Sequence, residues 1–248
     1  MELYPSMQTS TTGPNGYFDP EVKAKITGNR FLESLAPEII ERLSASLKEV
    51  ELRGDDYLLH EDEPVEWIYF PKTAVISEFQ MLEDGRTIEV GLIGKDGVVG
   101  SAALLSSNPA INSAQVYVGG RALRMGAESF DRRLLMNAAF QKPLHNLIEV
   151  HMKRLSQRLI CSTFHSMEQR LCTWLLRVND RAGKDRFQIT HEHIARSLGV
   201  HRPSISATLQ HLRDKGLFDY GRAHIRLLDP SGLKKLACSC YSEERVTA

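Results

Sequence analysis

Two hydrophobic periods divide the chain, one typical of strands and the other typical of helices. Between residues 50 and 125, short runs rich in β-branched and aromatic residues are separated by turns that contain Gly and Asp. These runs are Val50–Arg53, Tyr57–His60, Trp67–Phe70, Ala74–Phe79, Thr87–Ile93, Gln115–Val118 and Ala122–Met125. Seven or eight short strands with tight turns predict a sandwich or jelly roll of about 100 residues, after a short helical segment at residues 31–47.

After Phe130 the period changes, and the pattern predicts one long helix that reaches about Thr163. Its apolar stripe has spacings of three and four residues and consists of Leu144, Ile148, Met152, Leu155 and Leu159. Because only thin domains flank so long a helix, we expect this stripe to pair with the same helix of a second chain. A second helix, from Met167 to about Arg181, should pack against the segment that follows it.

Residues 190–212 predict two short helices joined at Gly199. The first helix has Thr190 as its N-cap, and its apolar side consists of Ile194, Ala195 and Leu198. The second helix begins near His201 or Arg202, and its apolar side consists of Ile205, Leu209 and Leu212. Pro203 fits the first turn of this second helix, where a missing N–H costs nothing.

Gly216 ends the second helix, and residues 217–228 predict a hairpin. Helix, turn, helix and hairpin in this order predict a winged helix. The side of the second helix that faces away from its apolar stripe carries Arg202, Pro203, Ser204, Ser206 and Gln210. A helix about 10–12 Å across fits the major groove of DNA, so we expect this side to contact DNA.

The local charge supports contact with DNA. Residues 184–226 contain eight Lys and Arg residues and four Asp and Glu residues, a net charge of +4, whereas the whole chain is neutral. A basic module on an acidic body is typical of phosphate contact. The alternative is a helical hairpin packed inside a core, but the exposed side of such a helix usually carries Glu and Lys rather than short polar residues.

The composition predicts a folded, cytoplasmic protein that does not enter a membrane. Hydrophobic residues make up 42% and charged residues 25% of the chain, as in ordinary globular proteins. The longest apolar runs are far shorter than the ~20 residues of a membrane span, and no signal-peptide pattern opens the chain. Residues 1–29 are expected to form a flexible arm, because Met1–Gly16 is rich in Ser, Thr, Gly and Pro.

No motif predicts catalysis, so the chain is not expected to be an enzyme. His191 and His193 are two residues apart and point to different faces of a helix, unlike the zinc pair of a hydrolase. Cys161 and Cys172 have apolar neighbours and are expected to be buried. Cys238 and Cys240 lack a second Cys or His pair at ligand spacing, so we predict no metal and no cofactor. A response of these two thiols to oxidant is a minor hypothesis.

The order of β-roll, long helix and winged helix resembles that of the Crp/Fnr family of bacterial transcription regulators. The resemblance covers roughly residues 31–236 and is strongest over residues 190–229; Tyr69–Val75 and Leu82–Val90 also resemble family β-roll segments. It implies an α+β fold with a β-roll, or double-stranded jelly roll (30–128), a dimerisation helix (129–163), a winged helix-turn-helix (164–240) and a tail (241–248). It also implies a homodimer that binds a near-palindromic site in double-stranded DNA, and contact with RNA polymerase.

The resemblance assigns roles to the second helix. Arg202 falls at the position of the family's guanine-contacting arginine, and Ser204 falls where a Ser or Thr contacts the DNA backbone. A guanidinium can donate two parallel hydrogen bonds to guanine O6 and N7. Pro203 and Ala207 stand where other members carry Glu and a second Arg, so the operator should differ from that of cAMP-responsive members. Weaker candidates for groove contact are His201, Ser206 and Gln210.

The resemblance also places an effector site, with departures from the family pattern. Nucleotide-binding members carry Gly-Glu and Arg-Ser/Thr-Ala, and the matching residues here are Gly100, Ser101, Asn112 and Ser113. Without the Glu and the Arg, a cyclic phosphate would lose its cation, which argues against a cyclic nucleotide. No cysteine precedes Cys161, which excludes the N-terminal iron–sulfur cluster of other members, and no β-roll histidine stands out as a haem ligand.

A second functional class remains open at the level of the sequence. The chain could be a ligand-sensing regulatory module whose winged helix docks a protein partner. Retention on a heparin or DNA column that falls with salt would favour DNA binding over this alternative.

Overall fold

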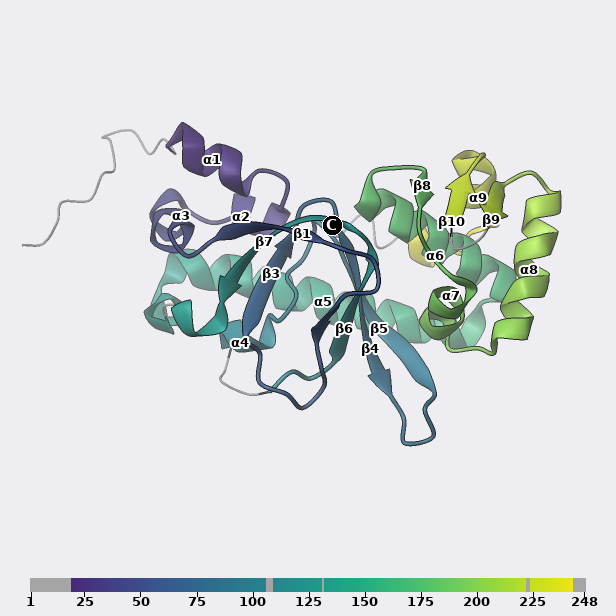
Figure 1. Cartoon of the computed structure of the whole chain (residues 1–248), viewed down its shortest axis with the longest axis horizontal. Coiled ribbons are helices and arrows are strands. Elements are labelled where there is room, and N and C mark those ends of the chain that lie inside the picture. Colours follow the sequence, from purple (N-terminus) through teal and green to yellow (C-terminus); the bar gives the residue numbers. More distant parts are fainter. Residues whose placement is uncertain (1–18, 106–108, 131, 222–223, 243–248) are drawn as a thin grey trace, which may run out of the picture.

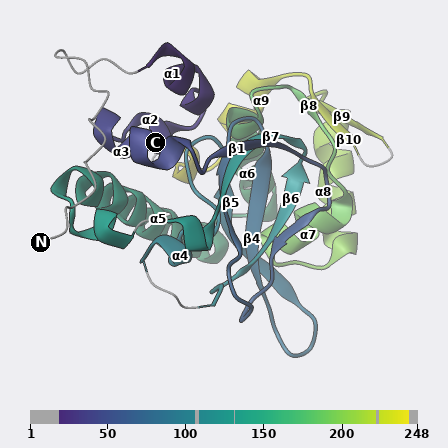
Figure 2. The same cartoon turned by 60° about the vertical axis from the view of Figure 1, so that its left-hand side comes forward.

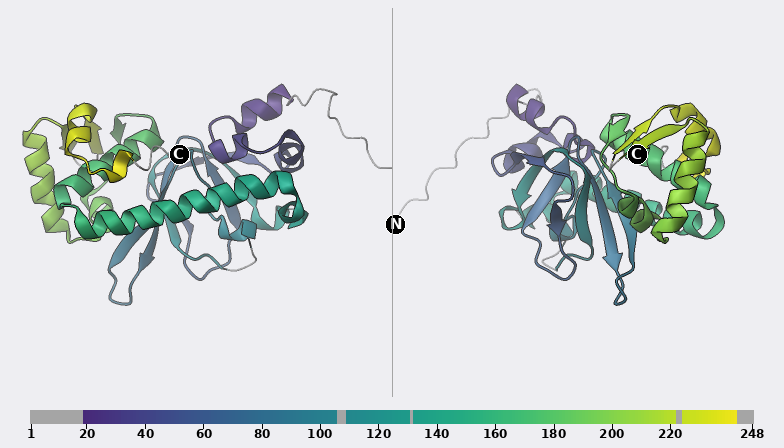
Figure 3. Two further views of the ribbon diagram at one scale, coloured as in Figure 1. Left: turned by 180° about the vertical axis from the view of Figure 1, so that it is seen from behind. Right: turned by 45° about the vertical axis from the view of Figure 1, so that its right-hand side comes forward.

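A long helix, α5 (Ala138–Phe164), runs along an N-terminal β-roll and reaches a C-terminal winged-helix domain (Figure 1). The computed structural model describes residues 19–105, 109–130, 132–221 and 224–242. Seen from behind, α5 crosses the front of the molecule, and no other element covers its middle (Figure 3, left). The predicted α+β architecture is confirmed.

Two antiparallel sheets form the β-roll. One has the strand order β1-β7-β3, and the other has the order β2-β6-β4-β5. Their bounds are β1 (Lys48–Leu52), β2 (Tyr57–Leu59), β3 (Trp67–Pro71), β4 (Val75–Met81), β5 (Thr87–Ile93), β6 (Ser113–Val118) and β7 (Gly120–Gly126). Each predicted run forms one strand, and buried side chains such as Ile76 and Val116 fill the space between the sheets.

Short helices close one end of the β-roll, and they correct the predicted flexible arm of residues 1–29. The helices are α1 (Pro20–Ile26), α2 (Arg30–Glu33), α3 (Pro37–Ser44) and α4 (Ala102–Leu105). Asp19 caps α1, and Ile26 and Asn29 are buried, so the ordered part begins well before residue 30. The Asn29 amide donates to the carbonyl oxygens of Pro71 and Gly97, both at 3.0 Å. Residues 1–18 lie outside the described ranges.

The start of α5 also differs from the expectation. Two 3-10 turns, η1 (Ala127–Ser129) and η2 (Arg132–Met136), occupy the segment after β7, and α5 begins only at Ala138. The Asn137 side chain accepts from the Ala139 N–H at 2.8 Å and so caps the helix. Despite its 27 residues, neither α5 nor another helix in the described ranges has the apolar length that a bilayer span requires.

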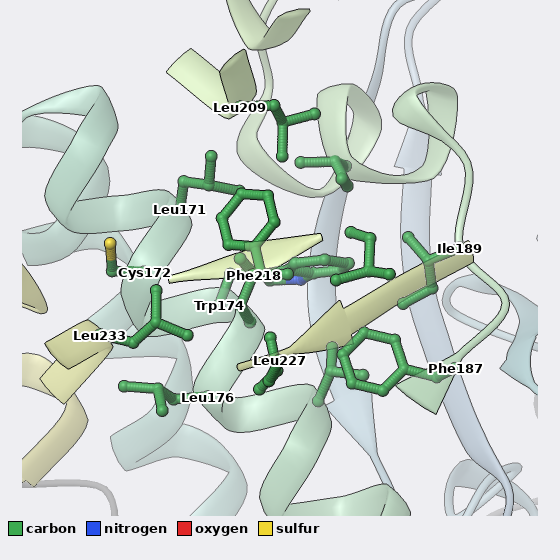
Figure 4. Packing of buried hydrophobic residues seen from close by; sticks show 14 of the residues in the cluster. Leu171, Cys172, Trp174, Leu176, Phe187, Ile189, Leu209, Phe218, Leu227 and Leu233 are labelled. Atoms are coloured by element: carbon green, nitrogen blue, oxygen red, sulfur yellow. The ribbon is translucent and has the colours of Figure 1, made fainter. Parts of the chain in front are cut away.

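A hydrophobic core holds the winged-helix domain together and extends to Leu92 and Tyr117 of the β-roll. Its elements are α6 (Met167–Ala182), β8 (Arg186–Phe187), α7 (His191–Leu198), α8 (Arg202–Asp214), β9 (Phe218–Gly221), β10 (His224–Leu227) and α9 (Pro230–Leu236). The strands form a sheet of order β8-β10-β9. Trp174 of α6 and Phe218 of β9 lie at its centre with Leu209 and Leu233 (Figure 4). The winged helix is confirmed, with β8 and α9 as additional elements; Arg222 and Ala223 of the hairpin turn lie outside the described part.

Candidate DNA-binding helix and effector cavity

Local sequence fixes where α8 begins and how it is turned. The Thr190 hydroxyl accepts from the His193 N–H at 3.1 Å and caps α7, and Gly199 ends α7 with a φ of 62°. The chain then turns, and α8 begins at Arg202 with a proline in its first turn. Its buried stripe, Ile205, Leu209 and Leu212, packs into the core, so the opposite side must face outward. α8 lies at the end of the molecule farthest from α1 (Figures 1 and 2).

Four of the six predicted DNA-contact residues are exposed together at the start of α8. They are His201, Arg202, Pro203 and Ser204. No acidic side chain in the described residues forms an ion pair with Arg202. A guanidinium held at the tip of an exposed helix and without a protein counter-ion is available to a phosphate or a base edge.

The other two predicted contact residues have partners inside the domain. Ser206 is half-buried, and its hydroxyl lies 3.3 Å from His191 Nδ1. The Gln210 amide donates to Asp214 at 2.7 Å, and its oxygen accepts from the Tyr220 hydroxyl at 3.0 Å. Tyr220 belongs to β9, so Gln210 braces the hairpin against α8. The sequence did not indicate this role, because it depends on the position of the hairpin.

The local charge of this domain is distributed unevenly. Arg196 points toward the β-roll, where it donates to Gln115 at 2.7 Å and lies 4.8 Å from the centre of the Phe79 ring. Arg213 pairs with Asp219 at 3.2 Å, and Lys215 pairs with Glu168 at 2.8 Å. Arg202, in contrast, has no acidic partner among the described residues. Burial and the charge of Arg202 lower the pKa of His191.

A cavity of about 170 Å³ lies between the β-roll and α5. Three of the four predicted effector residues line it, namely Gly100, Ser101 and Asn112. Gly100 has a φ of 78°, and a Cβ there would lie 3.0 Å from the Trp67 carbonyl oxygen, so this turn requires glycine. Ser113 is absent from the lining, and its hydroxyl accepts from the Glu61 N–H at 3.1 Å.

The cavity also contains ionisable side chains that sequence analysis did not single out. Glu78 of β4 is buried in its wall, and His151 and Arg154 of α5 complete the lining. Burial raises the pKa of Glu78 to about 7, against the opposing charge of Arg158. Burial and the charges of Arg154 and Arg158 lower the pKa of His151. Arg154 pairs with Asp96 at 2.5 Å.

Comparison with protein families decides what this pair of domains is. The family model described as a cyclic nucleotide-binding domain matches residues 49–137, and the model described as a Crp-like helix-turn-helix domain matches residues 169–236. The two matches fall on the β-roll and on the winged helix, in the order that the resemblance implied. The chain belongs to the Crp/Fnr family. It is a transcription regulator of this type, with a helix-turn-helix DNA-binding domain.

Solved structures of Crp/Fnr regulators share the fold. FixK2 from Bradyrhizobium japonicum is 20% identical, with a TM-score of 0.64 over 78% of this chain and 98% of that chain. A putative transcriptional regulator of the crp/fnr family from Eubacterium rectale is 18% identical, with a TM-score of 0.65 over 82% and 95%. A CRP-family transcriptional regulator from Thermus thermophilus, TTHB099, is 20% identical, with a TM-score of 0.64 over 77% and 96%. No curated protein matches the chain in sequence.

In this Crp/Fnr regulator, the winged helix packs directly on the β-roll of the same chain. The buried carboxylate of Glu89, in β5, accepts from Trp174 at 3.2 Å and from Ser197 at 2.9 Å, and it pairs with Arg158 of α5 at 2.7 Å. One carboxylate thus joins the β-roll, α5, α6 and α7. Charge-assisted hydrogen bonds of this kind are strong when they are buried and fully formed.

A second carboxylate and a ring stack join the same parts of the regulator. Asp96 pairs with Arg154 of α5 at 2.5 Å and with Arg181 of α6 at 3.2 Å. Burial raises the pKa of Asp96, but the two arginines outweigh this effect and the pKa lies below its ordinary value. His193 stacks on Tyr117 and pairs with Asp55 at 3.0 Å, while His191 faces α8. The two histidines therefore point to different faces, as predicted.

Proposed function

We propose that this regulator is a homodimer that contacts a near-palindromic operator in bacterial DNA through the start of α8, with Arg202 as its base-contacting side chain. The observation that carries the proposal is the exposed cluster His201–Ser204 at the tip of α8, led by a guanidinium without a described acidic partner. An arginine there can donate to guanine O6 and N7, and Ser204 can donate to a phosphate. The regulator acts in the cytoplasm, where it meets DNA and RNA polymerase.

The surface of α5 supports the homodimer. The predicted stripe divides in two, because Leu144 is buried against the β-roll and Ile148 is partly buried there. Further along, Met152, Leu159 and Phe164 are 63%, 70% and 78% exposed. Exposed apolar side chains spread over three turns of one helix favour pairing with another apolar helix. A second copy of α5 is the occupant that a two-fold operator requires.

The cavity supports an effector other than a cyclic nucleotide. Ser101 and Asn112 are neutral, and Arg154 is already paired with Asp96. Glu78 is buried in the wall, and in its ionised form it would repel an anionic phosphate. Pockets for ligands of ordinary size are about 300–1,000 Å³. The cavity of about 170 Å³ is smaller than these and fits a small molecule with few charges.

Selection of bound duplexes from a random pool, with the full chain as bait, tests the proposal. We expect an inverted repeat with half-sites about 34 Å apart, bound by two chains, with an affinity that falls steeply with salt. Addition of cAMP or cGMP should change neither the selected site nor the melting temperature of the protein. Enrichment of a single unrepeated half-site would contradict the dimer, and enrichment of no sequence would favour a protein partner for the winged helix.

A further inference from the structure

Four metal-ligand side chains from distant parts of the sequence meet where α5 ends. Cys161 belongs to the last turn of α5, and His165 follows that helix directly. Cys238 and Cys240 belong to the segment after α9. Among the described residues, the ligand atoms of these four side chains all lie within 4.8 Å of one another. The sequence predicts no metal because no second Cys or His pair at ligand spacing accompanies Cys238 and Cys240; the fold supplies that pair from Cys161 and His165.

The separations within this cluster are close to those of a tetrahedral zinc site. Zn–S bonds are about 2.3 Å and Zn–N bonds about 2.0–2.1 Å, so a tetrahedron has S–S edges of about 3.8 Å and S–N edges of about 3.5 Å. The sulfur atoms of Cys161 and Cys238 are 3.6 Å apart, and the Cys240 sulfur lies 3.4 Å from His165 Nδ1. Small side-chain rotations would bring the wider pairs, up to 4.8 Å, to the same edge length.

The surroundings of the cluster resemble the outer shell of a metal site. Gln157, one turn before Cys161, donates to the Cys240 sulfur at 2.9 Å. The Thr173 hydroxyl lies 3.1 Å from the Cys238 sulfur and accepts from the Cys238 N–H at 3.1 Å. Donors aimed at sulfur orient thiolate ligands and offset their charge. The three sulfurs form a buried cluster of their own, separate from the main cores, so they do not serve as ordinary apolar packing.

We propose that Cys161, His165, Cys238 and Cys240 bind one zinc ion in a Cys₃His site. Three thiolates and one imidazole in tetrahedral order suit Zn²⁺, because soft sulfur ligands select it over Mg²⁺ and Ca²⁺. Binding displaces the thiol protons of the three cysteines to solvent, and the imidazole binds as the neutral base through Nδ1. All four protein ligands are supplied by one chain, which leaves no open position, so the site is structural.

The position of the site indicates what it controls. α5 ends at Phe164, His165 has the extended φ and ψ of −107° and 146°, and α6 begins at Met167. This turn is the covalent link between the dimerisation helix and the winged helix. A zinc ion there ties the end of α5 and the turn after it to the C-terminal segment of the winged-helix domain, and so restrains the angle between α5 and that domain.

The metal content of the full-length protein, purified with a reductant and without chelators, tests the proposal. We expect about one zinc per chain, and we expect cobalt substitution to give the intense visible bands of a tetrahedral Co²⁺–thiolate site. The single variants Cys161→Ser and Cys238→Ser should lose the metal. Thr173→Val, which leaves all four ligands in place, should weaken zinc binding by about 10–100-fold. Cys172→Ser is the matched control, because Cys172 is a buried thiol of the main core and lies outside the cluster (Figure 4).

Two results would overturn the proposal. One is that the reduced wild-type protein binds neither zinc nor cobalt when the metal is added and the excess is removed by gel filtration. This result counts against the site even where mass spectrometry has found a Cys161–Cys238 disulfide before reduction. The other is a metal content that is the same in wild type, Cys161→Ser and Cys238→Ser. If a ligand variant folds poorly, the cobalt spectrum of the wild type alone still shows whether a tetrahedral thiolate site is present. Both readouts are independent of DNA binding, so they separate this site from the proposed operator contact.

Discussion

Arg202 occupies an electrostatically unfavourable position for a residue that serves the fold. It is the first residue of α8, where the helix dipole favours negative charge and a cation costs roughly 0.3–1 kcal/mol. Its side chain is exposed. Together with burial, its charge lowers the pKa of the half-buried His191. The residue therefore contributes little to folding, and the proposed contact with DNA would explain its position.

Replacement of Arg202 with Ala separates these two effects. We expect operator affinity to fall by about 10–100-fold, or 1–3 kcal/mol, with relaxed preference at one base pair per half-site. The free energy of unfolding should stay the same or rise slightly, because the unfavourable dipole interaction is removed. Fluorescence anisotropy with specific and random duplexes and urea denaturation measure the two quantities. The control is Lys235→Ala, an exposed cation on α9; equal losses on both duplexes for Arg202→Ala would mean that Arg202 contacts phosphate only.

Glu78 carries a pH dependence of stability with a definite sign. Its pKa is raised to about 7 in the folded protein by burial, so the unfolded chain releases this proton at lower pH than the folded one. Stability therefore falls as the pH rises from about 4.5 to 7 and stays reduced above that range. The charge of Arg158 opposes this rise in the pKa of Glu78, and Arg154 and His151, whose own pKa is lowered, line the same cavity as Glu78.

The variant Glu78→Gln removes that dependence. We expect a gain in the free energy of unfolding on the order of 2–3 kcal/mol at pH 8, and no gain below about pH 3.5, where the carboxyl is largely protonated in both states. Denaturation curves at several pH values measure the difference. Glu83→Gln, in the exposed turn of the β4–β5 hairpin, should show no such trend. A constant difference at all pH values would show that Glu78 keeps its charge state.

The sequence predicted which polar side chains of α8 are exposed better than it predicted which polar side chains elsewhere are buried. The exposure of Arg202 and Ser204 can be predicted from the helix period alone, because residues of α8 outside its buried apolar stripe face solvent. Gln210 has the same pattern, yet Tyr220 and Asp214 occupy its amide. In the sequence, Glu78 is a polar residue within the predicted strand Ala74–Phe79, and nothing there indicates that its side chain is buried. Its burial depends on α5 covering the sheet, which no local pattern records.

At the scale of elements, α5 has two different halves. Its first half packs on the β-roll through Phe140 and Leu144, and its second half exposes Met152 and Leu159. The sequence predicted the helical period of the stripe, because a spacing of three and four residues is a local property, but Leu144 and Ile148 pack on the β-roll of their own chain rather than remaining free to pair with a second one. It placed the helix start too early, because the 3-10 turns after β7 carry apolar residues as a helix would, and Asn137 alone marks the cap.

A charge in the second half of α5 should break the proposed dimer. We expect Leu159→Glu to weaken self-association at least about tenfold, since a carboxylate would be buried without a partner. Light scattering coupled to gel filtration over a concentration series measures this effect. Lys153→Glu changes the charge of an exposed residue outside the stripe and is the control. An unchanged dimer in Leu159→Glu would place the interface elsewhere.

At the scale of the whole molecule, the β-roll and the winged helix are joined by buried carboxylates as well as by apolar contact, because Leu92 and Tyr117 of the β-roll pack into the core of the winged helix. Glu89 and Asp96 each pair with one arginine of α5 and bind a group of the winged helix. Such pairs contribute modestly when complete but are costly when one partner is removed. The sequence analysis assigned Glu89 only to a strand, because its partners Trp174 and Ser197 are far away along the chain.

Removal of the Glu89 charge tests this junction. We expect Glu89→Gln to lower the free energy of unfolding by about 3–5 kcal/mol, because Arg158 would keep a buried charge without its counter-ion. Hydrogen exchange should rise first in α6 and α7, whose side chains bind Glu89. Glu51→Gln, on an exposed position of β1, should leave both quantities unchanged. Uniform destabilisation without faster exchange in α6 and α7 would indicate that Glu89 stabilises the β-roll alone.

The path of β5 has a mechanical consequence. At one end, Ile93 lines the cavity, and Gly91 pairs with Glu78 across a register shift in the ladder. At the other end, the Ile88 side chain approaches Gly199, where a Cβ would lie 3.2 Å from it, at the turn between α7 and α8. The six residues from Ile88 to Ile93 span only about 17 Å, so the cavity and the turn between α7 and α8 are connected by one short strand. A molecule that enters the cavity and displaces β5 would thus move Ile88 against the turn at Gly199, and so shift α8 relative to the β-roll.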